Sequence, residues 1–462
     1  MSRTIRRAAS VVAVSVALGW VAPASAQTAA SVSQELAQMR AQMEAMARRI
    51  DELEGQLVQA RSEAGNAAEA ANEAKALAVE AKQAPPVEVA WKGAPQFSGE
   101  GGWSFKPRGR LQVDAGRVSR PDGITDAGLG FGSELRRAYI GFDGTLPGGF
   151  GYRAEIDVAG SSVEITDLYL TYAASKELTL TVGQHKPFWS MEEMGSDLFT
   201  SFSERAAMNT SFGFERRLGA SATYSDGPLL VQGGVFTDNV RDLNNDEDNS
   251  WSIDGRAVFS PRIGDGLLHV GGSLHYSELN DAAASVRYRV RPLVHTTDLR
   301  FIDTGAIVAT SETGYGLEVA YLSGRFHATG EAHWQKVGRV GGPNPTFFGG
   351  YAEVGYFLTG GDTRTYKNGA YDRVKPKNPV NKGGMGALEL NLRYDRLDLS
   401  DAGIVGGKQN GYQIALVWTP TDYTRFLLNY GRMEYSDAFI PAAGGDRSYG
   451  VDAFGMRAQF DF

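Results

Sequence analysis

The chain ends in Phe454-Gly-Met-Arg-Ala-Gln-Phe-Asp-Phe462, FGMRAQFDF. Apolar side chains stand at every second position of this stretch, and Gly, Arg, Gln and Asp stand between them. Successive residues of an extended strand point to opposite sides. The spacing therefore predicts a β-strand that has one apolar face and one polar face.

The first 26 residues predict export of the chain. Basic residues precede an apolar run from about Val11 to Val21, which is followed by Ala24-Ser25-Ala26. A charged start, a short apolar core and an A-x-A site together indicate a signal peptide at residues 1–26, cleaved before Gln27. The alternative, an N-terminal anchor helix, is disfavoured because the apolar run is too short to cross a bilayer.

The rest of the chain contains no run of about 18 consecutive apolar residues, so no further membrane helix is expected. The mean hydropathy of the whole chain, −0.27, suggests a soluble protein, but membrane β-barrels escape this test because only alternate residues meet lipid. The alternating strand that closes on Phe462 resembles the last strand of bacterial outer-membrane barrels. A chain with 57 glycines and no cysteine fits such a barrel, and disulfides, catalytic thiols and thiolate metal sites are excluded.

Residues 27–83 predict a coiled coil. From Leu36 to Ala81, apolar or small residues recur at alternating spacings of three and four, which makes seven unbroken heptads. A lone helix cannot bury this seam, so we expect partner chains and favour a homotrimer, although Met and Ala in the seam discriminate poorly between oligomers. An isolated Ala-rich helix is the alternative. Pro85-Pro86 would end the helix, and residues 84–97 are predicted to be a short, stiff linker.

Period-two segments fill residues 98–462, separated by Gly, Pro, Asp and Asn. Short and long connections alternate, as expected for periplasmic turns and external loops. Residues 360–383 should be a turn by this alternation but are long, so either the turn is elaborate or the strand count is wrong nearby. The sixteen predicted strands, an even number as single-chain bacterial barrels require, are 105–115, 134–145, 150–159, 163–174, 177–185, 214–226, 228–238, 250–260, 267–279, 313–323, 325–339, 349–359, 384–399, 409–419, 422–436 and 449–462.

Alternation also sorts the two faces of each strand. In residues 384–399, the apolar side chains from Leu388 to Tyr394 are predicted to face lipid, and the polar side chains from Glu389 to Asp395 to face the interior. A polar interior implies water inside, and sixteen strands enclose an aqueous channel. The predicted fold is therefore an all-β, 16-stranded antiparallel transmembrane β-barrel with an N-terminal α-helical coiled coil in the periplasm.

Seven stretches spread over the predicted barrel form a recognisable set: RRAYIGFDG (136–144), QHKPFWSMEEMGSDLFTSFSERA (184–206), RYRVRP (287–292), LTGGDTRTYK (358–367), VKPKNP (374–379), ALELNLRYDRLDL (387–399) and RFLLNYGR (425–432). Together they resemble the outer-membrane family of phosphate- and polyphosphate-selective porins. The resemblance implies trimers of sixteen-stranded barrels that conduct anions along a ladder of arginines, with a third loop folded into each pore. Residues 186–213 occupy the place of that loop.

The resemblance assigns the upper part of the arginine ladder. Arg287, Arg289 and Arg291 are implied to be rungs in the fifth external loop, and Arg136 and Arg137 are implied to lie lower down. The first three alternate in sequence, so an extended backbone points them the same way. Arginine stays charged at physiological pH, and its forked donors match phosphate oxygens.

The resemblance also assigns a central and a lower site. Lys186 and Arg205, in the inserted loop, match positions near the central basic site. Ser190 is a looser match, because HKPFWS departs in spacing from the family's arrangement. Arg108 and Arg110 occupy roughly the region of the family's lower lysine cluster, but they are arginines.

The alternative for these cations is a structural role. They would then pair with lumen acids such as Glu193 and Glu204 and brace the inserted loop. The net charge of −8 does not oppose anion passage, because charges further away than roughly 8–10 Å are screened by salt.

The sequence predicts a passive, anion-selective outer-membrane channel that favours phosphate, pyrophosphate or polyphosphate and is surrounded by outer-membrane lipid or lipopolysaccharide. A general or differently selective porin is the alternative, and the coil of such a porin could also tether the outer membrane to the cell envelope.

No shared Ser/His/Asp motif supports an enzyme, and neither a cofactor nor a nucleic-acid partner is expected. Even-spaced histidines are interpreted as polar lining rather than metal ligands: His269, His275, His327 and His333.

Overall fold

The computed structural model of the chain describes residues 29–83, 87–243, 249–280 and 285–462. The chain divides into two compact units, Met1–Pro85 and Pro86–Phe462. The predicted signal peptide lies outside the described residues. Within the described part of the chain, no helix is long and apolar enough to cross a membrane.

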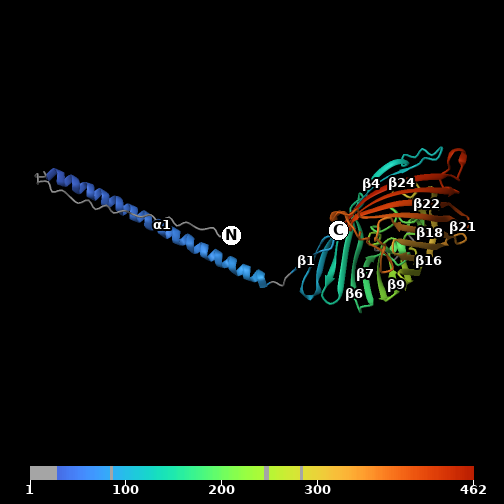
Figure 1. Cartoon of the computed structure of the whole chain (residues 1–462), viewed down its shortest axis with the longest axis horizontal. Coiled ribbons are helices and arrows are strands. Elements are labelled where there is room, and N and C mark those ends of the chain that lie inside the picture. The colour runs from blue at the N-terminus through green and yellow to red at the C-terminus, as the bar shows by residue number, and fades with distance from the viewer. Residues whose placement is uncertain (1–28, 84–86, 244–248, 281–284) are drawn as a thin grey trace. The chain divides into compact units, whose positions relative to one another are not determined.

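The first unit contains one helix, α1 (Ala29–Gln83), within its described residues (Figure 1). Its 55 residues span roughly 80 Å at about 1.5 Å per residue. The predicted seam is uncovered in a single chain, since Leu36 keeps 48% and Ile50 keeps 56% of its surface exposed. Most of the stability of a helix in water comes from covering its apolar face. The coiled coil with partner chains therefore stays a prediction.

The second unit is an antiparallel β-barrel (Figure 1). The last strand closes the barrel on the first, with Phe454 opposite Arg117 and Asp461 opposite Arg110. Each predicted strand overlaps an observed one, so the sixteen-stranded barrel is confirmed. Its sixteen strands, all within the described residues, are β3 (Ser104–Val118), β4 (Gly130–Leu146), β5 (Phe150–Asp157), β6 (Glu164–Ala173), β7 (Leu178–His185), β8 (Arg217–Asp226), β9 (Leu229–Phe236), β10 (Trp251–Phe259), β12 (Gly266–Glu278), β16 (Ile307–Ser323), β17 (Phe326–Arg339), β18 (Thr346–Phe357), β21 (Ala387–Asp401), β22 (Ile404–Thr421), β23 (Thr424–Ser436) and β24 (Gly450–Asp461).

The predicted faces of the strands are also confirmed. In β21, Leu392 and Tyr394 keep 48% and 40% of their surface, while Arg393 and Asp395 between them keep 4% and 2%. Apolar side chains therefore point outward to where lipid lies, and polar side chains point into the lumen.

Residues 84–97, predicted to be a linker, contain a hairpin from Glu88 onward. β1 (Glu88–Trp91) pairs with β2 (Pro95–Ser98), and β2 pairs with β3. The linker prediction is corrected here. The apolar residues of EVAW alternate with polar or small ones, and the adjoining edge of β3 offers backbone partners.

Three connections of the second unit, each with short helices or strands among its described residues, bear on the interior of the barrel. The inserted loop (residues 186–216) follows β7, the outer loop (residues 285–306) follows β12, and the inner turn (residues 358–386) follows β18. Their short elements are α2 (Met191–Met194), α3 (Ala207–Phe212), β13 (Ser285–Val286), β14 (Arg289–Val290), β15 (Ile302–Asp303), β19 (Thr365–Lys367), β20 (Ala370–Asp372) and η2 (Val380–Lys382). Elsewhere lie η1 (Glu100–Gly102), β11 (Arg262–Ile263) and η3 (Ala443–Gly445).

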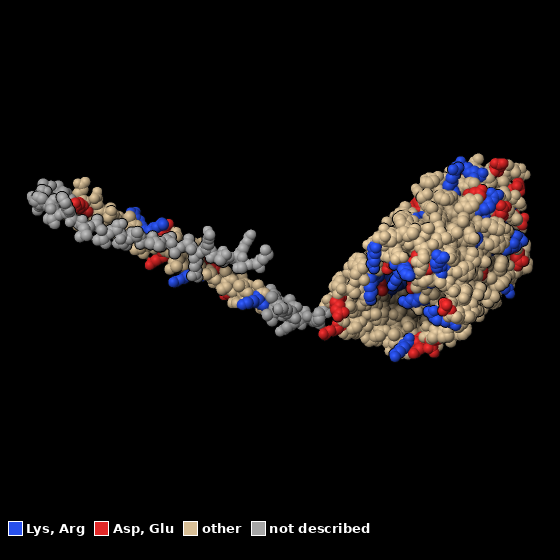
Figure 2. Space-filling model, viewed as in Figure 1, with Lys and Arg blue, Asp and Glu red and all other residues tan. Residues whose placement is uncertain are grey.

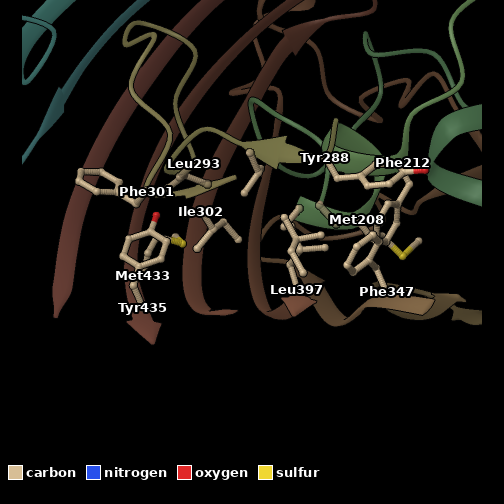
Figure 3. Packing of buried hydrophobic residues seen from close by; sticks show 14 of the residues in the cluster. Met208, Phe212, Tyr288, Leu293, Phe301, Ile302, Phe347, Leu397, Met433 and Tyr435 are labelled. Carbon is tan, nitrogen blue, oxygen red and sulfur yellow. The ribbon is translucent and has the colours of Figure 1, made fainter. Parts of the chain in front are cut away.

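The main apolar core of the second unit is formed largely by the inserted loop, the outer loop and the inner wall (Figure 3). Met208 of the inserted loop and Ile302 of the outer loop belong to the same buried cluster as Phe347 and Leu397 of the wall. Folded-in segments therefore fill part of the lumen, and they decide where water and solutes can pass.

Candidate functional site

The inserted loop is fixed to the wall by a carboxylate at the start of α2. Glu331 of β17 accepts hydrogen bonds from the backbone N–H groups of Met191 and Glu192 at 2.8 and 2.9 Å. The hydroxyl of Tyr351 donates to the same carboxylate at 2.6 Å, and Arg393 donates to the side chain of Glu192. These buried, charge-assisted bonds hold α2 in one place inside the barrel.

The second helix of the inserted loop packs directly on β18 at a glycine. A Cβ added to Gly349 would lie 2.5 Å from the Cβ of Met208 and 3.0 Å from the ring of Phe212. Only glycine allows this approach. The ring of Phe212 also meets that of Tyr288 in the outer loop, with centroids 5.5 Å apart (Figure 3), so the inserted and outer loops support one another.

The inner turn folds into the lumen as a hairpin. At its tip Asn368 and Gly369 have φ of +50° and +75°, as a two-residue type I′ turn requires. At its base Arg364 donates to both carboxylate oxygens of Glu389 in the wall at 3.1 Å. Residues 360–383 are therefore an elaborate turn, and the predicted strand count is right.

A cavity of about 640 Å³ lies between the inserted loop, the inner turn and the inner faces of β3 to β8. We call it the cationic cavity. Among the described residues that line it, ten are basic and five are acidic, so the cavity carries excess positive charge. Figure 2 shows Lys and Arg gathered where the face of the barrel unit is hollowed. The basic residues are Lys106, Arg108, Arg110, Arg137, Arg153, Lys186, Arg205, Arg216, Lys367 and Arg373, and the acidic ones are Glu155, Asp167, Asp197, Asp372 and Asp461.

Acids hold several of these cations in position. Asp197 of the inserted loop contacts Arg110 and lies 2.7 Å from Nε of Arg137. Asp167 of β6 lies 2.6 Å from Nε of Arg216. Each ion pair uses part of a guanidinium, and an arginine has five N–H donors. The pairs therefore orient the arginines while leaving donors for a solute.

Other cations of the cavity lack such a partner. Within the described residues, Lys106 and Lys367 have no carboxylate within 4.0 Å. Arg153 has only a loose pair, 3.5 Å from Asp167. Lys106 of β3 and Lys367 of the inner turn therefore give the cavity positive charge that no ion pair among the described residues compensates.

Five of the sequence-predicted residues meet in the cationic cavity: Arg108, Arg110, Arg137, Lys186 and Arg205. The predicted bracing also occurs, because Glu193 lies 3.0 Å from Lys186 and 3.4 Å from Arg205. Both interpretations therefore apply to the inserted loop, whose cations line the cavity and are braced by its own acid.

A smaller cavity of about 100 Å³ lies between the inserted loop and the outer loop. It is lined by Arg136, Arg205 and Arg291, among others. Arg136 is paired with Glu204 at 3.0 Å, as the bracing interpretation expects. Arg205 lines this cavity and the cationic cavity, so its side chain stands between the two.

The arginine row of the outer loop keeps its predicted alternation. Arg287 and Arg289 are exposed and Arg291 is half-buried, while Tyr288 and Val290, which alternate with them, are buried. Arg287 lies 2.6 Å from Asp303, and Arg291 lies 2.6 Å from Asp298. Arg289 has no carboxylate within ion-pair distance in the part of the chain that the structure describes. Two arginines of the row are thus paired, and Arg289 is open to solvent.

A further arginine, which the sequence analysis did not single out, belongs to this row. Partial burial and the positive charges of Arg291 and Arg289 lower the pKa of Arg300 to about 10. It remains charged at neutral pH. Mutual repulsion among three arginines indicates a locally positive potential at the outer loop.

Ser190 does not line the cationic cavity. Its hydroxyl accepts a hydrogen bond from the backbone N–H of Glu193 at 3.2 Å and one from Nδ2 of Asn209 at 2.7 Å. The side chain is buried, with 5% of its surface exposed. The prediction of an anion contact at Ser190 is corrected: its hydroxyl caps α2, because the backbone there leaves amides to satisfy.

The sequence analysis missed the cations of the inner turn and one cation of the first strand, Lys106. Lys106, Lys367 and Arg373 line the cavity, and Arg373 pairs with Asp461 near the end of the chain. The sequence did hold a signal for this hairpin: Asn368-Gly369 between TYK and AYD is a strong pattern for a two-residue β-turn.

Comparison with known proteins agrees with the geometry. The family described as "Phosphate-selective porin O and P" matches residues 105–462. An uncharacterized protein of Caulobacter vibrioides is 44% identical over 448 residues, which cover 94% of this chain and 90% of that protein.

Two solved structures are similar to the chain at low sequence identity. The outer-membrane expressed OmpT of Vibrio cholerae has a TM-score of 0.50 at 12% identity, over 81% of this chain and 100% of that chain. An anion-selective porin from Comamonas acidovorans has a TM-score of 0.48 at 13% identity, over 78% and 100% of the two chains. The first likeness shows the fold alone. Because the family match spans the closed barrel, the chain is an outer-membrane channel protein and belongs to the family of phosphate-selective porins O and P.

Proposed function

We propose that this porin passes small anions and favours those that carry phosphate, including pyrophosphate and polyphosphate. The observation that carries the proposal is the cationic cavity, in which basic side chains outnumber acidic ones two to one. A confined cavity of one charge sign raises the local concentration of counter-ions. Guanidinium groups in addition match the oxygens of phosphate in pairs.

The proposed path has several cationic positions in series. It runs from the outer loop with Arg289, past Arg291 and Arg136 at the smaller cavity, to Arg205 and then to the cationic cavity. Conduction requires binding that is strong enough for entry and weak enough for release. Two unit charges 4 Å apart attract by about 4 kcal/mol at an effective dielectric constant of about 20, which suits affinities between millimolar and micromolar.

The partly paired cations favour a second candidate, a general or differently selective porin. Asp197 occupies part of the donors of Arg110 and Arg137, and Asp461 does so for Arg373. If these pairs persist while solutes pass, the positive charge left for anions comes mainly from Lys106 and Lys367. Such a channel would discriminate less between chloride and phosphate.

We also propose that α1 lies in the periplasm and joins three chains. The support is its uncovered seam and its charge pattern. Glu35 and Arg49 stand at position g of the heptad, and Arg40 and Glu54 stand at position e. In a parallel, in-register coil, Glu35 faces Arg40 of the next copy and Arg49 faces Glu54 of the next copy, so both contacts join opposite charges. The same coil could hold the outer membrane to the cell envelope.

Reversal potentials in planar bilayers test the transport proposal. In a KCl gradient we expect the reversal potential to lie towards the chloride potential, as for an anion-selective channel. When phosphate replaces chloride on one side, we expect phosphate to carry current. A potential that shows selectivity for K⁺ would remove the anion proposal. Anion selectivity combined with exclusion of phosphate would favour the second candidate.

A further inference from the structure

The cationic cavity is larger than an inorganic anion requires. Its volume of about 640 Å³ lies within the range of roughly 300–1,000 Å³ that is usual for pockets that hold small organic molecules. At about 30 Å³ for each water molecule, the same space takes roughly twenty waters. The cavity therefore has room for an anion that carries an organic group.

Aromatic side chains form part of the wall of this cavity. Tyr169 of β6, Phe199 of the inserted loop and Tyr371 of the inner turn are half-buried and line it from three different elements. The passage of inorganic anions needs the cations but makes no use of these rings. The full aromatic lining is Tyr139, Tyr169, Phe188, Phe199, Tyr371 and Phe462.

Cations of the cavity lie over two of these rings. The guanidinium carbon of Arg373 is 5.1 Å from the ring centre of Phe199, and that of Arg153 is 5.8 Å from the ring centre of Tyr169. A guanidinium stacks through its face and donates hydrogen bonds from its edge. Each pair therefore sets an aromatic face beside donors that suit a phosphate group.

Support of the arginines is the alternative role for these rings. Phe202 fits that role, because its ring lies 4.5 Å from the guanidinium carbon of Arg393 and the residue is fully buried. Tyr169 and Phe199 differ, since both line the cavity and keep part of their surface exposed. A ring that only supports a cation gains by being covered, so surface left open to the cavity favours contact with a solute.

We propose that the cationic cavity binds phosphate monoesters that carry a flat aromatic ring. The inference rests on the proposed function, because the phosphate group uses the same cations as inorganic phosphate. The ring of the ester stacks on Tyr169 or Phe199, while Arg153, Arg373 and Lys106 attract the phosphate. Flat rings of phosphate-bearing ligands stack on aromatic side chains and on guanidinium planes, and this stacking adds to the attraction between charges.

The test measures how inorganic phosphate, phenyl phosphate and cyclohexyl phosphate block the chloride current of the full-length protein in planar bilayers. At about pH 8.5 both esters are dianions, so they differ chiefly in the aromatic face. For wild type we expect phenyl phosphate to block at a concentration at least about fivefold lower than either other anion. The cyclohexyl ring is the more apolar of the two, so burial of apolar surface alone would give the opposite order of the esters.

A double variant, Tyr169→Leu with Phe199→Leu, keeps apolar side chains and removes the aromatic faces. We expect its preference for phenyl over cyclohexyl phosphate to fall to within about twofold, with the block by inorganic phosphate within about twofold of wild type. The matched control is Phe131→Leu with Tyr224→Leu, which replaces two exposed rings outside the cavity lining. The control should keep the preference of wild type.

The wild-type comparison does not depend on the folding of a variant. Equal block by the two esters, together with block by inorganic phosphate, would overturn this inference and leave the proposed function standing. Absence of block by all three anions would overturn both. A full preference for phenyl phosphate in the double variant would overturn the assignment of the stacking surface to Tyr169 and Phe199.

Discussion

The Nε atom of Arg137 in β4 lies 2.7 Å from the Oδ2 atom of Asp197 in the inserted loop. Arg110 of β3 contacts the same carboxylate. One acid of a folded-in segment thus compensates two cations of the wall. The charge that a solute meets in the cationic cavity is therefore set by the loop as well as by the barrel.

Replacing Asp197 by Asn should increase anion selectivity, because Arg110 and Arg137 lose their counter-charge while the side chain keeps its shape. Reversal potentials in a KCl gradient measure the change, which should be towards the chloride potential. Urea unfolding should show a loss of stability of about 1–3 kcal/mol. Breaking a fully buried pair costs roughly 3–5 kcal/mol, and water in the cavity screens part of this. An unchanged reversal potential would mean that the pair lies off the conducting path.

Replacing Lys106 and Lys367 by Gln should weaken anion selectivity and the block of chloride current by phosphate, each by several fold. Among the residues that the structure describes, neither lysine has a carboxylate within 4.0 Å, so both add positive charge to the cavity. Both are at least partly exposed, so the unfolding midpoint should change little. Lys382→Gln, on the exposed surface of the same turn outside the cavity lining, is the control and should behave as wild type. Equal effects of the lysine pair and the control would contradict the assignment.

Gly349→Ala should displace α3 from the wall. The added Cβ would stand 2.5 Å from the Cβ of Met208, and overpacking of this kind costs typically about 1–3 kcal/mol. Single-channel conductance should change together with the free energy of unfolding, because the inserted loop bounds both cavities. Gly360→Ala is the control, since nothing lies within 4 Å of its added Cβ. Normal conductance in Gly349→Ala would show that the inserted loop does not limit the current.

Gly369→Val should loosen the hairpin of the inner turn. The residue has a φ of +75°, which a β-branched side chain adopts only with strain. We expect Lys367 to leave its place in the cavity, the conductance to rise and the phosphate block to weaken. Asn368→Gly, which keeps the turn geometry, should retain both properties. A phosphate block of full strength in Gly369→Val would contradict a role for the hairpin in the pore.

Leu53→Glu should disrupt the association of α1 between chains. A charge in the seam has to be desolvated when helices pack, and Leu53 occupies a central d position of the heptads. Chemical cross-linking of the full chain should then yield less trimer through α1, with channel currents retained. Gln59→Glu, outside the seam, is the control. Equal cross-linking of both variants would support an isolated helix.

The strands of the barrel could be predicted because lipid imposes a rule at every second residue. Leu392 and Tyr394 must face out, and Arg393 and Asp395 between them must face in. The rule is local, so it can be found in a single sequence. EVAW and PQFS, residues 88–91 and 95–98, form strands that are too short to stand out from a linker in the sequence.

The interior could be predicted only in part, because its contacts join distant residues. The pairing of Arg364 with Glu389 and of Arg373 with Asp461 brings the inner turn into the lumen, and no spacing in the sequence encodes these contacts. Ser190 shows the opposite error: a position near a family motif was assigned to the solute, but local backbone geometry uses its hydroxyl as a helix cap. Residue type and sequence neighbourhood predicted well which cations lie in the lumen. They predicted less well which of these cations lack an ion-pair partner.

The most direct measurement is the chloride current through wild-type protein in planar bilayers, titrated with phosphate. The cationic cavity should bind phosphate more tightly than chloride, so the current should fall in a saturable manner with a midpoint between millimolar and micromolar phosphate. Arg287→Ala, Arg289→Ala and Arg291→Ala together should raise this midpoint. A chloride current that phosphate leaves unchanged would contradict phosphate recognition in the lumen.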